Sequence, residues 1–321
     1  ASITCGTFGY RMLIPCYVLL VFLLADALDW VQQRSEASKA VAWVATIGLL
    51  FAFARAQQRD PNIAGARLSE PIATVKGATI GNALREAFAA RDPLVAVDAA
   101  GAIPYFSGLR SLDMLGLNDG HIARHRDASF GHGEQGHELG DGAYVLSREP
   151  DVVVAHVHGS NRLRYPGGRE MEADPRFKRE YRRIRVHAEE PVPLSFVMYC
   201  RLEGRVGIQV SDGLVRIPGY LFASSRGTQA QFDDTRTLGT RFLQPAERSI
   251  GPVELSPGTW HLSATGKGPL QLAARRQSDG LAASRVADGI ELALKEGVPV
   301  DIVVLGNQPA FLTDVVARRM D

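Results

Sequence analysis

DPLVAVDAAGAIPYFSGLRSLDMLGLND, residues 92–119, is the segment that decides the fold. Its run LVAV is short and apolar, which is typical of a fully buried strand, and the run ends at Asp98. A short helical or irregular segment then leads to LRSLDMLGL, which predicts a second strand or a turn. Ligands of α/β domains bind at the carboxyl ends of strands. We therefore expect the polar side chains at or after these strand ends to converge, namely Asp98, Tyr105, Asp113 and Asp119.

The sequence on both sides of this segment predicts an α/β layer. Upstream, ATIGNALREAF places apolar residues at helical spacing, and downstream DVVVAHVHG is a third apolar strand. A helix followed by strands in this order favours a mostly parallel sheet. The polar stretch AQQRDPNIAGARLSEP, which contains two acidic residue–proline pairs, is typical of a linker or turn.

From residue 191 onward the pattern changes to short strands separated by turn residues. Segments such as PLSFVMYC, GLVRIPGYLFAS and VPVDIVVLG follow one another at short intervals, with Gly, Pro, Asp and Ser between them. The segment VELSPGTWHLSATG indicates two strands joined by a turn, with Trp260 and Leu262 on one face. The end, FLTDVVARRMD, is a strand or a helix. This spacing predicts a C-terminal β-sandwich.

The first sixty residues carry two long apolar runs. MLIPCYVLLVFLLA and AVAWVATIGLLFAFA are joined by the polar link QQRSEASK. Each run is short for a membrane span and would also suit a buried core helix, but the pair favours a transmembrane helical hairpin. The fold class is then two N-terminal transmembrane helices followed by an α/β layer and a C-terminal β-sandwich. The expected domains are 1–60, the hairpin; 61–190, an α/β extracytoplasmic domain; and 191–321, the β-sandwich.

The composition excludes several classes of function. With 36 basic and 35 acidic residues the net charge is +1, so no global field attracts a nucleic acid, and we expect no nucleic-acid partner. The three cysteines are scattered, which excludes a disulfide framework. The phosphate-binding and dinucleotide-binding glycine motifs and the serine nucleophile elbow are all absent from the sequence.

Two polar segments have both a functional and a neutral interpretation. Residues 121–141 combine imidazoles and carboxylates, which suggests a metal site, but only His121 and His125 show helical spacing and no Glu of a zinc hydrolase motif lies between them. We therefore favour a loop over the strand ends in which His132 and Glu134 contact an anionic or sugar ligand. No metal ligand and no cofactor is assigned, although a divalent metal is compatible. The basic run RFKREYRRIRVH is either a solvated surface or a contact with lipid phosphate.

Taken together, three segments resemble the C-terminal part of bacterial polytopic membrane glycosyltransferases of the GT-C class, most closely the arabinofuranosyltransferase-like proteins. They are FGYRMLIPCYVLLVFLLA, VAVDAAGAIPYFSGLRSLDMLGLND and GHGEQGHELGDGAYVLSREPDVVV. The matching positions are 11–15, 98–109, Asp113, 116–117, Asp119 and 131–132. The resemblance covers the chain to about residue 154 and extends more loosely over the predicted sandwich. Its motifs are moderately specific, because several short segments occur together in the right order.

The resemblance implies a function at the cytoplasmic (inner) membrane. Such enzymes transfer a sugar from a polyprenyl-phosphate donor to a glycan acceptor outside the membrane. Their catalytic acid usually lies in an early extracytoplasmic loop, so we expect it upstream of this chain and assign no catalytic residue here. The soluble domain would then be extracytoplasmic and help to bind the acceptor glycan, with membrane lipid as a further partner. The alternative is a membrane-anchored, non-catalytic carbohydrate-binding or envelope-interaction protein.

Overall fold

The structure, a computed structural model, describes residues 14–33, 35–59, 61–126, 130–133, 136–156, 162–276, 284–286, 289–306 and 309–321. The chain divides into two compact units. The first comprises residues 1–72 and 134–136, and the second comprises residues 73–133 and 137–321. Helices come first and a large, mostly β region comes after them, as the sequence predicts.

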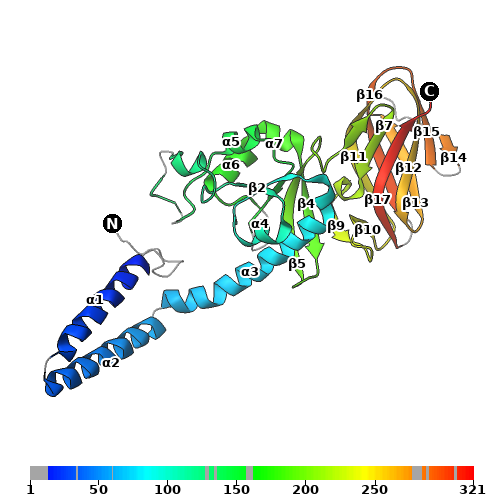
Figure 1. Cartoon of the computed structure of the whole chain (residues 1–321). Coiled ribbons are helices and arrows are strands. Elements are labelled where there is room, and N and C mark those ends of the chain that lie inside the picture. The colour runs from blue at the N-terminus through cyan, green and yellow to red at the C-terminus, as the bar shows by residue number, and fades with distance from the viewer. Residues whose placement is uncertain are drawn as a thin grey trace. The chain divides into compact units, whose positions relative to one another are not determined.

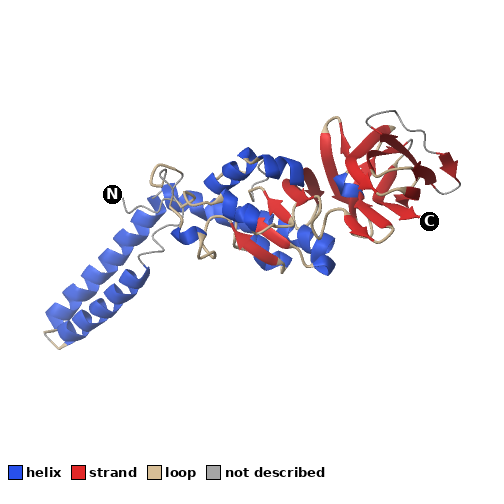
Figure 2. Cartoon of the chain, turned by 90° about the horizontal axis from the view of Figure 1, so that it is seen from above, coloured by secondary structure: helices blue, strands red, loops and turns tan. Residues whose placement is uncertain are grey.

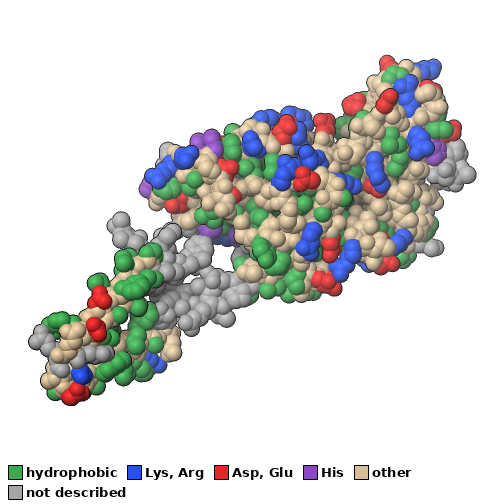
Figure 3. All heavy atoms as spheres, in the orientation of Figure 1, with side chains coloured by type: hydrophobic (Ala, Val, Ile, Leu, Met, Phe, Trp, Pro, Cys, Tyr) green, Lys and Arg blue, Asp and Glu red, His purple; other side chains and the backbone are tan. Residues whose placement is uncertain are grey.

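The first unit contains two long helices, α1 (Ile14–Gln32) and α2 (Glu36–Arg59), which contact each other (Figure 1). Their bulky apolar side chains face outward (Figure 3). For example, Phe22 is 65% exposed and Phe51 is 67% exposed. In the described part of the chain, one helix is long and apolar enough to cross a membrane. It is residues 36–56, with a mean hydropathy of 1.7 and no buried residue. The predicted pair of helices is confirmed, and the crossing of a membrane by both stays a prediction.

The described residues of the segment predicted as a linker, 56–59 and 61–71, are helical, so that prediction was wrong. α3 (Pro61–Phe88) covers residues 61–71 of this segment and continues through the predicted helix that comes next. Proline fits the first position of a helix because the N–H that it lacks would have no partner there. Pro71 lies inside α3 and removes one backbone hydrogen bond, but this loss does not stop a helix whose next turns are anchored. Ile80, Leu84 and Phe88 provide that anchor, because all three are buried.

The second unit begins with a six-stranded sheet whose order is β2–β1–β3–β5–β4–β9. The strands are β1 (Leu94–Val97), β2 (Arg110–Asp113), β3 (Val152–Val154), β4 (Tyr181–Ala188), β5 (Leu194–Arg201) and β9 (Gly227–Phe232). The three predicted strands, β1 to β3, pair in parallel. β5 is antiparallel to both of its neighbours, and β9 is parallel to β4.

Helices cover both faces of this sheet (Figure 1). Successive residues of a strand point to opposite faces, so Val95 and Val97 join the core cluster that contains Ile80 and Leu84 of α3, whereas Ala96 joins the other cluster. The covering elements are α4 (Ala102–Ser107), α5 (Gly142–Ser147), α6 (Pro166–Ala173) and α7 (Pro175–Glu180). Residues of α5, α6 and α7 belong to the second cluster, and Ile103 of α4 belongs to the first. Burial on both faces explains why β1 and β3 are continuous apolar runs.

The remainder of the second unit is almost entirely β (Figure 2). One antiparallel ladder has the order β11–β16–β13, and a second has β17 at its centre, paired with β12, β7 and β10. The bounds are β7 (Leu214–Pro218), β10 (Leu238–Phe242), β11 (Ala246–Leu255), β12 (Gly258–Lys267), β13 (Leu270–Arg276), β16 (Val298–Gly306) and β17 (Ala310–Arg319). Shorter strands complete the region: β6 (Gln209–Ser211), β8 (Ala223–Ser224), β14 (Ser284–Val286) and β15 (Gly289–Leu294). Trp260 and Leu262, two positions apart in β12, lie on one face of the strand, as predicted, and both are buried.

Three strands differ from the sequence predictions. The segment PLSFVMYC, assigned to the C-terminal domain, is β5 and pairs with β3 and β4 in the first sheet. Part of the basic run is β4, in which Arg183, Arg185 and His187 alternate with buried Ile184, Val186 and Ala188. β9 lacked a signal because GTQAQF is polar, yet it lies between β4 and β10. The partner strand decides the sheet that β5 joins, and it decides the strand structure of β4 and β9, which local hydrophobicity does not indicate.

Candidate functional site

One edge of the first sheet gathers the carboxyl ends of five strands. β1, β2 and β3 are parallel, and β5 is antiparallel both to β3 and to β4. β4 therefore runs in the direction of β1, and β9, which is parallel to β4, does so too. In α/β sheets this is the edge where ligands bind. The polar side chains just beyond these five strands are thus the candidates for a site.

Asp98 and His156 form a buried pair at this edge. Asp98 directly follows β1 and His156 follows β3, and Nδ1 of His156 lies 3.2 Å from Oδ2 of Asp98. The strand β1 lies between β2 and β3, so the chain leaves β1 on one side to form β2 and later returns on the other side to form β3. Asp98 and His156 therefore lie where the strand order reverses. Ligands usually bind at this position in such sheets. The Asp98 side chain is only 4% exposed, and its Oδ1 has no hydrogen-bond partner among the described residues. An unpaired buried acceptor costs about 1–3 kcal/mol, so a ligand that donates a hydrogen bond to it would relieve that cost.

Asp113 and Tyr105 have different surroundings. Asp113 ends β2 and is buried, and its two carboxylate oxygens accept hydrogen bonds from the N–H groups of Leu115 at 2.9 Å and Asn118 at 2.6 Å. Its carboxylate therefore holds the turn after β2. Tyr105 lies on α4 and is 81% exposed, with its ring edge-on to Phe106. An exposed aromatic ring near the strand ends can stack on an apolar ligand face.

Asp119 belongs to a connected group of side chains. Its Oδ1 accepts the N–H groups of His121 and Ile122, and its Oδ2 accepts the Tyr144 hydroxyl at 3.1 Å. The Tyr144 ring stacks on His121 with 4.0 Å between ring centroids. His121 Nε2 lies 2.8 Å from Oδ2 of Asp141, and His125 Nδ1 lies 3.6 Å from the same oxygen. The structure thus joins residues that are well separated in the sequence.

Two pKa shifts define the charge state of this group. Burial raises the pKa of Asp141, but the hydrogen bonds from the Tyr144 N–H and from His121 outweigh it, so the pKa of Asp141 lies below its ordinary value. Burial raises the pKa of Tyr144, and its hydrogen bond to Asp119 raises it further. At neutral pH the group therefore holds an ionised carboxylate at Asp141 and a protonated phenol at Tyr144.

The remaining predicted residues stand apart from this group. His132 is exposed and forms no hydrogen bond with another described residue. Glu134 lies outside the described residues. The structure therefore brings together Asp98 with His156, and Asp119 with the two histidines and Asp141, but among the described residues it provides no such partner for His132.

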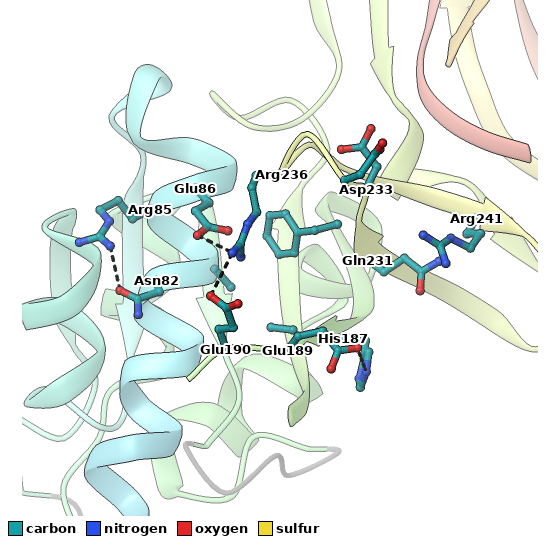
Figure 4. A pocket seen from close by; sticks show the side chains of 14 residues that line it. Asn82, Arg85, Glu86, His187, Glu189, Glu190, Gln231, Asp233, Arg236 and Arg241 are labelled. Atoms are coloured by element: carbon teal, nitrogen blue, oxygen red, sulfur yellow. Dashed lines mark hydrogen bonds and ion pairs between the residues drawn. The ribbon is translucent and has the colours of Figure 1, made fainter. Parts of the chain in front are cut away.

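A groove of about 590 Å³ opens beside the ends of β4 and β9 (Figure 4). α3 contributes Asn82 and Glu86, the end of β4 and the residues after it contribute His187 to Glu190, and β9 and β10 contribute Gln231, Phe232 and Arg241. β4 and β9 end at the same sheet edge as β1 and β3. The lining is thus rich in carboxylates, amides and guanidinium groups, with one aromatic ring.

Arg236 closes one side of the groove. Its guanidinium group lies 3.5 Å from Glu86 of α3 and 2.9 Å from Glu190 (Figure 4). Arg236 adopts a left-handed backbone conformation with φ 61°, which is uncommon for a residue other than glycine and is held here by its surroundings. Gln231 and Arg241 are different, because neither side chain forms a hydrogen bond or ion pair with another described residue. These two polar groups remain available to a ligand.

Asp233, at the end of β9, makes the stability of this region depend on pH. Burial raises the pKa of Asp233, but the N–H groups of Thr237 and Thr235, the Lys267 ammonium and the Thr235 hydroxyl lower it to about 2. A lowered pKa stabilises the fold above the ordinary value near 4, and the gain is lost as pH falls through 2. After allowance for solvent screening, we expect a loss of about 1–2 kcal/mol between pH 4 and pH 2. Unfolding monitored by the fluorescence of buried Trp260 should show this loss in the wild type.

The matched variants for this prediction are Asp233→Asn and Asp212→Asn. Asp212 is exposed and serves as the control. The Asp233→Asn protein should show a flatter pH dependence than the wild type over the same interval, and the Asp212→Asn protein should behave as the wild type does. Identical curves for all three proteins would exclude Asp233 as the source.

The sequence predictions missed the histidine partner of Asp98 and the whole groove. The signal for His156 was its position just after the third buried strand, at the edge where Asp98 ends the first. His121, His125 and Asp141 were considered but assigned to a solvated loop, because their three-dimensional contact depends on α5. The groove residues lie on α3, β4, β9 and β10, and polar positions on separate strands give no local pattern.

One comparison with known proteins gives a match. Residues 62–202 match a family described as Domain of unknown function (DUF8728). The matched segment runs from the beginning of α3 to the end of β5, and thus includes Asp98, His156 and the group around Asp119. No curated protein and no solved structure matches the chain.

Proposed function

We propose that α1 and α2 cross the cytoplasmic (inner) membrane and that the second unit is extracytoplasmic. The support is the outward exposure of their bulky apolar side chains, which a water-soluble helix pair would bury. In a bilayer, lipid chains surround these apolar side chains, so the side chains need no protein partner to be shielded from water. α2 meets the length and hydropathy of a span, and α1, with its own apolar run, completes a hairpin.

The finer assignment of the C-terminal region belongs to the same proposal. We take this region as a β-sandwich, formed by the β11–β16–β13 ladder and the ladder centred on β17. Residues of both ladders, among them Ile250, Ile302, Leu262 and Leu312, share one hydrophobic cluster. Two antiparallel ladders that bury their inner faces against each other are the arrangement that defines this architecture.

The proposed function is that of the C-terminal portion of a membrane glycosyltransferase with a polyprenyl-phosphate-linked sugar donor, in which the soluble unit binds the acceptor glycan. The observation that carries it is the polar groove at the carboxyl edge of the sheet. Its carboxylates, amides and guanidinium groups supply both donors and acceptors for sugar hydroxyls, and Phe232 supplies an apolar face. Membrane helices would anchor the chain in the membrane that contains the lipid-linked donor. No catalytic residue is assigned to this chain.

Arg241→Ala tests the glycan-binding part of this proposal. The full chain, purified in nanodiscs, is titrated with a panel of bacterial envelope polysaccharides and their oligosaccharides by calorimetry. We expect one class of glycan to bind and Arg241→Ala to weaken it about tenfold, because a hydrogen bond to a charged group contributes about 1.5 kcal/mol. Arg226→Ala is the matched control, since Arg226 is exposed and does not line the groove. The absence of any glycan binding, or an equal loss in both variants, would refute the assignment.

Sugar transfer distinguishes the proposal from its alternative. Because no catalytic residue is assigned to this chain, the assay uses the product of the whole gene in nanodiscs. It is incubated with a polyprenyl-phosphate-linked sugar and the glycan that the chain binds, and the product of transfer is detected by mass spectrometry. Transfer supports the glycosyltransferase assignment. Glycan binding without transfer favours a membrane-anchored, non-catalytic carbohydrate-binding or envelope-interaction protein.

A further inference from the structure

The two histidines and the carboxylate near Asp119 have the composition of a metal site. One nitrogen each from His121 and His125 and one oxygen from Asp141 all lie within 4.8 Å of one another. The two imidazoles are about half exposed, at 48% and 46%, whereas the carboxylate is 14% exposed. The three ligand atoms therefore have the protein on the side of the carboxylate and solvent on the side of the imidazoles.

The backbone places the two histidines at the two ends of a short 3-10 turn, residues 122–124. The N–H of His125 donates to the carbonyl oxygen of His121 at 3.1 Å, and the rings stack with 5.9 Å between centroids. Ile122 anchors this turn because it is fully buried. Gly116, with φ 78°, passes so close that a Cβ there would lie 2.7 Å from the Ala123 nitrogen. The turn thus holds two imidazoles side by side, and imidazole nitrogen is a common zinc ligand in proteins.

Asp141 is fixed independently of the histidines. Its Oδ1 caps α5 by accepting the Tyr144 N–H at 2.8 Å, which leaves Oδ2 directed at the imidazoles. The Tyr144 hydroxyl then connects α5 to Asp119, whose other oxygen holds the histidine turn. Asp119 and Tyr144 thus act as a support for the three candidate ligands, which is the role of outer partners in metal sites.

The distances suit a small divalent cation. Bonds of about 2.0–2.2 Å in a tetrahedral site separate the ligand atoms by about 3.4 Å. The two separations that end at the Asp141 oxygen, 2.8 and 3.6 Å, are on either side of this value, and the two imidazole nitrogens lie within 4.8 Å of each other. Imidazole and carboxylate together favour a first-row transition metal over Ca²⁺ or Mg²⁺, which prefer oxygen ligands.

We propose that His121, His125 and Asp141 bind a divalent first-row transition metal, for which Zn²⁺ is the probe. The fourth position faces solvent and would hold water or an oxygen atom of a ligand. The metal would fasten the segment between β2 and α5 to the beginning of α5, at the edge of the sheet where β1 and β3 end. The proposal is independent of glycan binding.

The test measures metal binding by the full chain in detergent, carried on a tag without histidine and freed of metal by a chelator. Calorimetry with Zn²⁺ and elemental analysis after gel filtration should give about one Zn²⁺ per chain. Replacement by Co²⁺ should give the visible bands of a tetrahedral nitrogen and oxygen site. His125→Ala should weaken Zn²⁺ binding more than about 100-fold, and Tyr144→Phe, which removes only the support, about tenfold.

The controls separate a built site from scattered surface binding. Asp141→Asn keeps a cap acceptor for α5 but removes the charge, so it should lose the metal while the circular dichroism spectrum is retained. His187→Ala alters another exposed histidine next to a carboxylate, Glu189 at 3.0 Å, and should bind Zn²⁺ as the wild type does. A wild type without retained Zn²⁺, or one whose affinity survives His125→Ala, would overturn the proposal.

Discussion

An arginine in place of Ile47 is expected to prevent α2 from inserting into a membrane. Ile47 lies near the middle of residues 36–56 and is 63% exposed. At a helix centre, an apolar residue such as isoleucine favours insertion by about 0.3–0.6 kcal/mol, whereas arginine opposes it by about 2.5–3.5 kcal/mol. The change therefore costs about 3–4 kcal/mol, enough to turn a mostly inserted helix into a mostly excluded one. The fraction inserted is measured by glycosylation mapping of the full chain in microsomes.

Ile47→Leu is the matched control for this substitution. Leucine has nearly the same transfer free energy as isoleucine, so insertion should be unchanged. An inserted fraction that does not respond to arginine would show that α2 does not lie in hydrocarbon. A wild-type chain that is soluble without detergent would have the same meaning for the helix pair.

The parts of the fold that the sequence predicted are those with a local signal. LVAV and the VVV of residues 152–154 are buried on both faces of the sheet, and this double burial is what a continuous apolar run indicates. Only the C-terminal half of α3 was predicted. A proline inside a sequence usually indicates the end of a helix, so the prediction placed a turn at Pro71, whereas α3 continues through Pro71. β4 and β9 could not be predicted locally, because their strand structure depends on pairing with each other and with β5 or β10.

The candidate site shows the same limit. The positions of Asp98 and Asp113 at strand ends can be predicted from the sequence, but their roles cannot. Asp113 uses both carboxylate oxygens to hold a turn, whereas Asp98 keeps one oxygen without a partner among the described residues. The difference arises from the spatial neighbours of each carboxylate, and for Asp98 that neighbour is His156, which lies 58 positions away. A single sequence gives no information about such a contact.

The groove depends on a core that extends beyond the first sheet. Phe88, at the end of α3, belongs to the same hydrophobic cluster as Val97 of β1 and Phe242 of β10. Its ring meets Tyr220 edge-on with 5.8 Å between centroids. Two residues of α3 that line the groove, Asn82 and Glu86, lie within about two helical turns of Phe88. The position of α3, and with it one wall of the groove, therefore depends on this packing.

Phe88→Ala is accordingly expected to destabilise the second unit by about 3–5 kcal/mol, because Phe88 is only 1% exposed and its removal leaves a cavity that rigid neighbours cannot fill. Urea unfolding of the full chain in detergent, monitored by the fluorescence of buried Trp260, measures the change. Trp260 lies on β12 and reports on the β region. If Phe88→Ala shifts the single Trp260 unfolding transition to a lower urea concentration than in the wild type, α3 and the β region unfold together. Leu243→Ala, at a position that is 75% exposed, should change stability by less than about 0.5 kcal/mol. A Phe88→Ala protein whose Trp260 transition is unchanged would mean that α3 contributes nothing to the β region, and the groove would then lack a fixed wall.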